Sequence, residues 1–365
     1  MSGLPVRPEI AAAEPYGAPH PDVPVRLNVN ENPYPPPPEV VDGIVQRVRQ
    51  AAEQANRYPD RDFTALRSAL ADYLAREAEV PDITPDMIWA ANGSNEVMLQ
   101  LMQVFGGPGR TAIGFEPAYS MYPEYARNTF TTWRPTQRGP DFAFDLARAL
   151  RQIEHEAPTV VLLDSPNNPT GLITPLETVE ALAEQTAGRA VLLVDEAYGE
   201  FRQPGTPSAL KLLARYPHLA VSRTMSKAFA FAGVRLGYLA AAPELIGYLR
   251  TVRLPYHLSA ITQATALAAL DYAGLMLSQI AELRERRKRL ASALGAMGFT
   301  VTDSEANFVL FGRFEDRHAT WRKLLAQGVI IRQVGPAGWL RVSVGTEAET
   351  LAFLRALART REELE

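Results

Sequence analysis

The chain has no cysteine among its 365 residues. This absence excludes disulfide bonds, thiolate catalysis, iron–sulfur clusters and cysteine-based zinc sites. The chain has only five histidines, and they are scattered without the spacing typical of metal ligands: His20, His155, His218, His257 and His318. We therefore expect no metal site.

The chain also lacks a strong charge of either sign, because its formal net charge is −4. This gives no reason to expect nucleic acid or an anionic membrane surface as a partner. The basic run 284–289 is interrupted by acidic residues, which is typical of a solvated helix face. No apolar run approaches the roughly 20 residues of a membrane span, and the N-terminus lacks the apolar stretch of a signal peptide. We expect a cytoplasmic protein.

Lysine is scarce, with only four among the 37 lysines and arginines. Lys211, Lys288 and Lys323 lie in amphipathic helical patterns, which predicts solvated positions. Lys227 differs, because it follows an apolar strand pattern and stands among hydroxyls and small residues. A lysine can lose a proton and attack a carbonyl to form a Schiff base, which arginine cannot do. Lys227 is thus the candidate catalytic residue, and a plain surface lysine is the alternative.

The chain divides into three predicted parts. Residues 1–37 are rich in proline and predict an extended arm, which must lie on the body of the protein or on a partner subunit. Residues 38–250 predict a large α/β domain, and residues 251–365 a smaller α+β domain.

Apolar, β-branched runs alternate with helical patterns in the large part. This alternation predicts βαβ units and a doubly wound, mostly parallel sheet. The predicted strands are 111–115, 159–163, 190–194, 220–222 and 235–240. The predicted helices of this part are 38–56, 62–78, 95–105, 118–127, 143–156, 175–187 and 206–215. Helices at 243–252, 259–273 and 277–296 lead to predicted strands 307–312, 328–333 and 339–344 and helices 316–327 and 347–360.

Polar side chains follow three of the predicted strands where each strand ends. Ligands of open α/β sheets bind outside the carboxyl ends of the strands. We therefore expect one crevice to gather four side chains: Asn168, Asp195, Tyr198 and Lys227. Taken singly, Asn168 could belong to a plain turn and Asp195 could be a strand-end cap.

These four residue types suit pyridoxal phosphate (PLP). Lys227 would bond to its aldehyde, and Asp195 would pair with the ring N–H, keeping the ring protonated as an electron sink. Asn168 and Tyr198 would hydrogen-bond the phenolic oxygen of the ring. Tyr119 could stack on the ring, or it could be a core aromatic.

A phosphate cradle is predicted at the start of the helix near residue 95. Ser94 is the expected N-cap there, and free amides at a helix start attract a phosphate. Ser226 and Arg235 can add a hydroxyl and a guanidinium. The glycine-rich segment 105–110 follows a helix and precedes a strand, which is the wrong order for a dinucleotide site, so we interpret it as a turn.

Several motifs together resemble the fold-type I, PLP-dependent aminotransferases. They are Asn167-Asn-Pro-Thr-Gly171, Asp195-Glu-Ala-Tyr198 and Ser226-Lys-Ala-Phe with Ala232-Gly-Val-Arg-Leu-Gly237. The resemblance is closest to the histidinol-phosphate aminotransferase group and covers nearly the whole chain. The segments that carry this closer match are Pro15–Pro19, Leu27–Pro33, Asn56–Asp60, Gly93–Glu96 and Leu340–Thr346.

This resemblance implies amino transfer between L-histidinol phosphate and 2-oxoglutarate in histidine biosynthesis, by a homodimer with shared active sites. Tyr58 would reach the cofactor phosphate of the neighbouring subunit. The implied cofactor-binding residues are Tyr58, Gly93, Ser94, Asn95, Tyr119, Asn168, Asp195, Tyr198, Thr224, Ser226, Lys227 and Arg235. The implied substrate-binding residues are Tyr16, Asn30, Arg332 and Arg341.

Three alternatives stay open at this point. An aromatic amino-acid aminotransferase would use the same cofactor chemistry. A decarboxylase acting on a phosphorylated amino acid has similar motifs. A cofactor-sensing module of a transcription regulator would need an attached helix-turn-helix and a basic face, and neither is present in this sequence.

Overall fold

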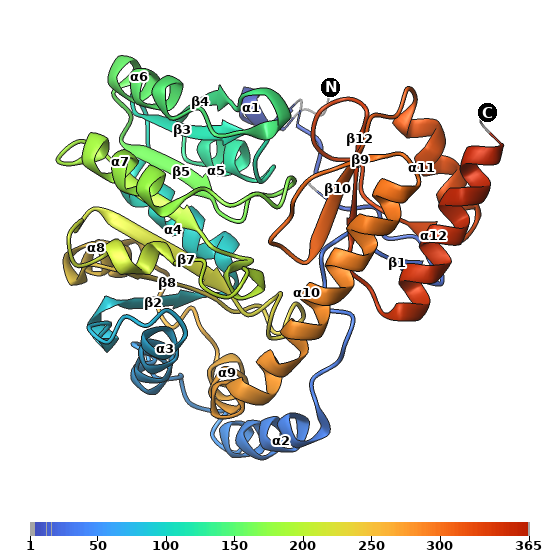
Figure 1. The fold of residues 1–365 in the computed structure, drawn as a ribbon. Helices are drawn as coiled ribbons and strands as arrows, with labels where there is room; N and C mark the ends of the chain where they lie inside the picture. Colours follow the sequence, from blue (N-terminus) through green and yellow to red (C-terminus); the bar gives the residue numbers. More distant parts are fainter. Residues whose placement is uncertain (1–3, 12, 16, 364–365) are drawn as a thin grey trace.

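A computed structural model describes residues 4–11, 13–15 and 17–363 of the chain. Its largest sheet has seven strands in the order β2-β8-β7-β6-β5-β3-β4 (Figure 1). Strand β8 runs antiparallel to both of its neighbours, and the other pairs are parallel. The predicted α/β class with a mostly parallel sheet is therefore confirmed. The strands are β2 (Ile88–Ala91), β3 (Thr111–Glu116), β4 (Thr132–Gln137), β5 (Val160–Asp164), β6 (Val191–Asp195), β7 (Leu219–Thr224) and β8 (Gly237–Ala241).

Helices pack around this sheet (Figure 1). Every residue of β5, β6, β7 and β8 is buried, as expected for strands covered on both faces. The helices are α2 (Pro38–Ala52), α3 (Thr64–Glu77), α4 (Ser94–Phe105), α5 (Tyr122–Asn128), α6 (Leu146–Glu156), α7 (Leu176–Thr186), α8 (Pro243–Val252), α9 (Ala260–Asp271) and α10 (Ala273–Ala296). The short 3-10 helices of the described residues are η1 (Pro85–Met87), η2 (Pro140–Phe142), η3 (Gly199–Phe201) and η4 (Ala209–Leu212).

The C-terminal part contains a three-stranded antiparallel sheet, order β12-β10-β9, with β9 (Thr300–Val301), β10 (Phe308–Gly312) and β12 (Trp339–Ser343). Helices α11 (Arg317–Ala326) and α12 (Glu347–Glu362) accompany it. The N-terminal segment has a short helix α1 (Pro8–Ala11) and a strand β1 (Val25–Arg26), which pairs in parallel with β11 (Val329–Ile330). Residue Leu27 then enters the apolar core of the C-terminal part, so this part of the arm lies on the body of the protein.

Helix α10 joins two apolar cores. Its first half places Met276, Ile280 and Leu283 in the core of the large sheet. Its second half places Leu290 and Leu294 in the core of the C-terminal part. Figure 1 shows this helix running from beside α9 toward the smaller sheets.

Some predicted elements differ from the observed ones. The helix predicted at 206–215 is wrong, because only η4 forms there. The Ser208 hydroxyl accepts a hydrogen bond from the Leu210 N–H and so caps this short helix. The strand predicted at 328–333 shortens to β11, followed by an isolated bridge between Arg332 and Arg341. Strands β1, β2, β4 and β9 were not predicted.

No single helix in the described part of the chain is long and apolar enough to cross a membrane. Helices α9 and α10 pass that test only as a pair, and they are bent by 71° where they meet.

Candidate active site

A cavity of about 990 Å³ lies at the carboxyl ends of β5, β6 and β7, and it is also lined by the N-terminal arm and the C-terminal part. Most of the predicted site residues line it: Asn30, Ser94, Asn95, Tyr119, Asn168, Asp195, Tyr198, Thr224, Ser226, Lys227, Arg235, Arg332 and Arg341. Gly93 lies next to the lining, and Tyr58 lies away from it on the surface. Tyr16 lies outside the described residues.

The Lys227 side chain lies inside this cavity. Its Nζ donates a hydrogen bond to the Val29 carbonyl oxygen at 2.9 Å, so the arm reaches the amine. Burial, helped by the positive charge of Arg341, lowers the pKa of Lys227 to about 8. A substantial neutral fraction therefore exists near neutral pH, as a nucleophilic amine requires. The other three lysines form ion pairs nearer the surface: Lys211 with Glu79, Lys288 with Glu285 and Lys323 with Glu363.

Asp195 ends β6 and is buried at the floor of the cavity. It accepts hydrogen bonds from the Ser222 hydroxyl at 2.9 Å and from the Tyr122 hydroxyl at 3.2 Å. Burial nevertheless raises the pKa of Asp195 to about 7, and the neighbouring Asp164 carboxylate contributes to this rise. Such a carboxylate needs a buried cation beside it, and a ring N–H would supply one. Ser222 and Tyr122 were not predicted as site residues; Ser222 is the partner of Asp195 in the pairing of β6 with β7.

This raised pKa predicts a pH-dependent stability of the cofactor-free protein. Between the ordinary pKa of 3.8 and about 7, the folded state binds a proton more tightly than the unfolded chain. The free energy of unfolding therefore falls as pH rises through this window. Asparagine does not ionise, so Asp195→Asn removes this fall in the free energy of unfolding. We therefore expect the variant to be more stable than the parent at pH 8, by a few kcal/mol at most. The difference should shrink toward pH 4.

Urea unfolding midpoints of the cofactor-free proteins at pH 4, 6 and 8 measure this effect. Asp303→Asn, at an exposed carboxylate, is the matched control and should follow the parent. Equal midpoints of Asp195→Asn and the parent at pH 8 would contradict the prediction.

Tyr198 is the centre of a small group of polar side chains. Its hydroxyl accepts hydrogen bonds from the amide of Asn30 at 3.0 Å and from the amide of Asn168 at 3.5 Å. Burial raises the pKa of Tyr198 to about 12, although the Arg341 charge opposes this rise. The phenol therefore stays protonated and can donate its own hydrogen toward an acceptor in the cavity.

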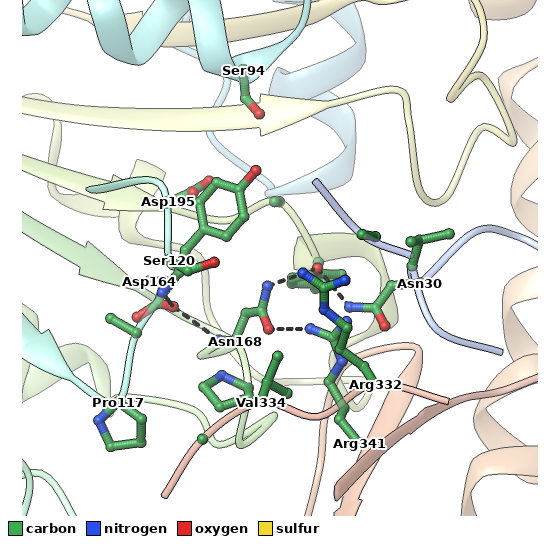
Figure 2. A pocket seen from close by; sticks show the side chains of 18 of the residues that line it. Asn30, Ser94, Pro117, Ser120, Asp164, Asn168, Asp195, Arg332, Val334 and Arg341 are labelled. Atoms are coloured by element: carbon green, nitrogen blue, oxygen red, sulfur yellow. Dashed lines mark hydrogen bonds between the residues drawn. The ribbon is translucent and has the colours of Figure 1, made fainter. Parts of the chain in front are cut away.

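Two arginines stand on the opposite side of the cavity from Ser94, with Asp195 and Asn168 between them (Figure 2). Arg332 and Arg341 are bridged through their backbones. One Arg341 nitrogen donates to the Asn28 carbonyl oxygen at 3.0 Å, and another contacts the Asn168 side-chain oxygen. These bonds fix the guanidinium, whose forked geometry suits carboxylate and phosphate groups.

The start of α4 forms the predicted cradle for an anion. The N-cap is Gly93, with φ +85°, and the helix begins at Ser94, so the prediction of Ser94 as N-cap is wrong. A Cβ at Gly93 would lie 2.6 Å from an Arg235 nitrogen, which shows that the guanidinium lies against the helix start. The first amides of a helix have no acceptor within the helix and attract phosphate. Nearby, the Thr224 hydroxyl donates to the Ser226 hydroxyl at 3.0 Å.

Tyr119 lies in the loop between β3 and α5 and lines the cavity. Its hydroxyl donates to the Asn95 side-chain oxygen at 3.2 Å, which ties the ring to the start of α4. A ring held in this way is available for stacking on a flat ligand, and that role stays a prediction.

The cavity therefore combines three features. A lysine amine has a lowered pKa, a buried carboxylate has no cationic partner among the described residues, and a helix start with an arginine forms an anion cradle. A single molecule with an aldehyde, a basic ring nitrogen and a phosphate meets all three demands. PLP is such a molecule, so the residues present fit this cofactor.

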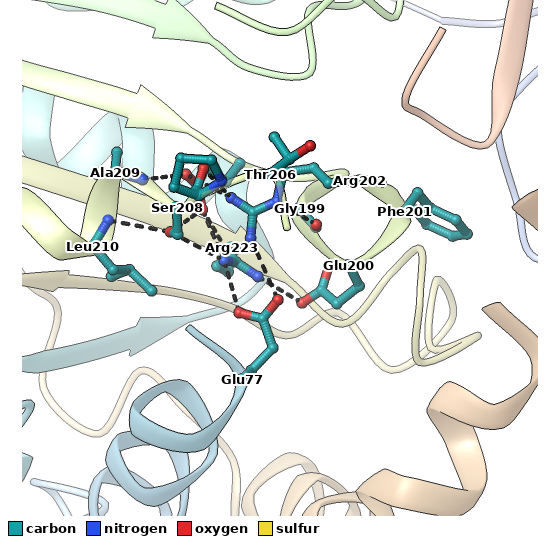
Figure 3. Close-up of polar contacts among 12 residues, drawn as sticks. Glu77, Gly199, Glu200, Phe201, Arg202, Thr206, Ser208, Ala209, Leu210 and Arg223 are labelled. Carbon is teal, nitrogen blue, oxygen red and sulfur yellow. Dashed lines mark hydrogen bonds and ion pairs between the residues drawn. The ribbon is translucent and has the colours of Figure 1, made fainter. Parts of the chain in front are cut away.

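A buried cluster of charged side chains lies on β7, in the segment after β6 and at the end of α3 (Figure 3). Its centre is Arg223, on the strand that leads to Lys227. Arg223 donates to Glu196 at 2.9 Å, to Glu200 at 3.1 Å and to Glu77 at 3.0 Å. Arg202 lies within 3.3 Å of Glu196 and 3.4 Å of Glu77. We call these five residues the Arg223 cluster.

Comparison with known proteins identifies the class. A family model described as aminotransferase class I and II matches residues 22–357. The chain belongs to this family, whose members are PLP-dependent transaminases.

Similarity to individual proteins is more specific. The chain is 56% identical to the histidinol-phosphate aminotransferase of Thermobifida fusca, over 98% of this chain and 95% of that protein. It is 54% identical to the histidinol-phosphate aminotransferase of Streptomyces avermitilis, over 100% and 98% of the two chains. A solved histidinol-phosphate aminotransferase from Sinorhizobium meliloti, in complex with pyridoxal-5'-phosphate, has the same fold, with a TM-score of 0.88, 24% identity and coverage of 100% and 99%. The predicted fold-type I architecture and the predicted family are both confirmed.

Proposed function

We propose that this chain transfers an amino group between L-histidinol phosphate and 2-oxoglutarate, yielding imidazole-acetol phosphate and L-glutamate, as a step of histidine biosynthesis. The identity of 56% to a histidinol-phosphate aminotransferase across nearly the whole chain supports this substrate pair. The observation that carries the proposal is the arrangement of the cavity. Lys227 shares it with the anion cradle at Ser94 and with the arginine pair on the other side.

Each residue would act through the contacts described above. The cradle of Ser94, Ser226 and Arg235 would hold the cofactor phosphate, and Asp195 would hold the ring proton. Bound PLP would supply an aldehyde that condenses with amines and a ring that withdraws electrons from the reacting carbon.

Lys227 would carry the proton of the reaction. With a pKa of about 8, its amine can accept a proton from the substrate carbon and return it at a neighbouring atom near neutral pH. Arg341 and Arg332 would bind the substrate anion, which is a phosphate in one half-reaction and a carboxylate in the other. Asn30 would orient the Tyr198 hydroxyl.

We also propose a cytoplasmic homodimer in which Tyr58 reaches the partner's cofactor. Tyr58 is 80% exposed and stacks on Tyr256, with ring centroids 4.3 Å apart. Leu254, which lies close to Tyr256 in the sequence, is 72% exposed. Apolar side chains gathered in this way favour a protein interface. The division into residues 1–37, 38–250 and 251–365 is part of the same proposal.

A comparison of amino donors tests the substrate. With 2-oxoglutarate as acceptor, we expect kcat/KM for L-histidinol phosphate to exceed that for L-phenylalanine by at least about tenfold. This is the value of roughly one charge-assisted hydrogen bond to the phosphate. A preference for phenylalanine would identify an aromatic aminotransferase, and release of carbon dioxide from a phosphorylated amino acid would identify a decarboxylase.

A further inference from the structure

A second buried carboxylate stands beside Asp195. Asp164 ends β5 as Asp195 ends β6, and the two residues are partners in the parallel pairing of these strands. Because paired positions of neighbouring strands place their side chains on the same face of a sheet, both carboxylates face the cavity, and both line it. Asp164 is 3% exposed and Asp195 is 5% exposed.

The hydrogen bonds of Asp164 join two loops. One oxygen accepts from the backbone N–H of Tyr119 at 3.2 Å and from the backbone N–H of Asn168 at 2.9 Å. The other accepts from the side-chain amide of Asn167 at 2.8 Å. Tyr119 belongs to the loop after β3 and Asn168 to the loop after β5, so one carboxylate fixes both segments that would contact the cofactor ring.

The charges around Asp164 are few. Arg138, after β4, lies 3.8 Å away and is buried, and one of its terminal nitrogens has no hydrogen-bond partner among the described residues. The other titratable groups that interact with it are Asp195 on β6, the Tyr122 hydroxyl on α5 and the Tyr198 hydroxyl in the segment after β6. Burial raises the pKa of Asp164, as it raises that of Asp195. When both carboxylates are ionised, they and the one guanidinium leave an excess of one negative charge, which a protonated ring would balance.

We propose, on the basis of the function above, that Asp164 is a positioning residue for the reaction: its carboxylate holds the Tyr119 and Asn168 segments together and adds the second negative charge that favours a protonated cofactor ring. Asp195 alone would hold the ring proton. Asp164 would act on the ring proton through its charge and through the two loops that it joins. Asp164 itself would make no contact with the substrate.

Asp164→Asn tests this role, because it keeps the shape and removes the charge. In the PLP-loaded protein, we expect the pH midpoint of the visible absorption titration of the bound cofactor to fall by about one pH unit. We expect kcat to fall about tenfold with KM changed by less than about threefold, since the ring becomes a weaker electron sink. Asp141→Asn, at an exposed carboxylate paired with Arg313, is the matched control and should match the parent.

Asp164→Glu separates the charge from the loop contacts. It keeps the charge but displaces the carboxylate, so we expect a midpoint close to that of the parent and loss of PLP on dialysis about tenfold faster. If Asp164→Asn does not fold, Asp164→Glu alone tests the proposal. Retention of PLP by Asp164→Glu equal to that of the parent would overturn the proposal. A midpoint and kcat of Asp164→Asn equal to those of the parent would overturn it as well.

The titration needs no amino donor. A parent that binds PLP but does not turn over histidinol phosphate would therefore contradict the proposed function, and the same spectra would still decide the role of Asp164.

Discussion

Replacement of Lys227 by alanine is expected to lower turnover by at least about 10⁴-fold, the upper range for the loss of a positioned acid–base group. The side chain supplies both the amine for the cofactor and the proton carrier, and its Nζ lies in the cavity within 2.9 Å of the Val29 carbonyl oxygen. Borohydride treatment should attach PLP covalently to the parent and not to Lys227→Ala. Mass spectrometry of the intact chain measures this directly.

Lys211→Ala is the matched control. Lys211 pairs with Glu79 and its side chain is 40% exposed, so its loss should change neither labelling nor turnover. Equal borohydride labelling of the parent and Lys227→Ala would remove the proposed mechanism.

Replacement of Arg223 by methionine is expected to give the largest loss of stability. The side chain is fully buried and contacts three glutamates of the Arg223 cluster. Methionine fills similar space but leaves these carboxylates without their main cation. Removing one partner of a buried ion pair typically costs about 3–5 kcal/mol. The urea unfolding midpoint of the cofactor-free protein measures the change.

Arg215→Met is the control for this variant. Arg215 pairs with Glu180, but its side chain is 63% exposed. Exposed pairs contribute only about 0–1 kcal/mol, so this midpoint should hardly move. Similar losses for both variants would show that burial of the Arg223 cluster has no special effect on stability.

Much of the large sheet could be predicted, because buried parallel strands are continuous apolar runs that the sequence displays directly. Strand β4 was not predicted, because it is not a continuous apolar run. It lies at the edge of the sheet, contains Pro135, and has Thr136 as its only buried residue. Edge strands tolerate proline and polar residues, so their pattern resembles that of a loop.

The candidate site could be predicted where its residues follow strand ends. Lys227, Asp195 and Asn168 all line one cavity because the carboxyl ends of neighbouring parallel strands meet at one edge. Asp164 occupies the same type of position, yet its role depends on which backbone amides two distant loops bring to it. No local sequence pattern predicts that these two backbone amides contact the same carboxylate.

The N-cap of α4 shows a different limit. Serine is a preferred N-cap residue, which favoured Ser94. The observed cap is Gly93, whose φ of +85° is a backbone conformation that residues with a Cβ rarely adopt. The backbone conformation before α4 therefore overrode the local preference for serine.

Helix α10 has a consequence for any attempt to express the C-terminal part by itself. A fragment starting at residue 251 would carry α9 and the first half of α10, whose Ala266, Met276 and Ile280 are buried against the large sheet's core. Cutting within α10 would instead deprive the second core of Leu290 and Leu294 or interrupt a continuous helix. The large part and the C-terminal part of this chain thus share one continuous helix, and neither can be expressed alone without exposing apolar surface to water.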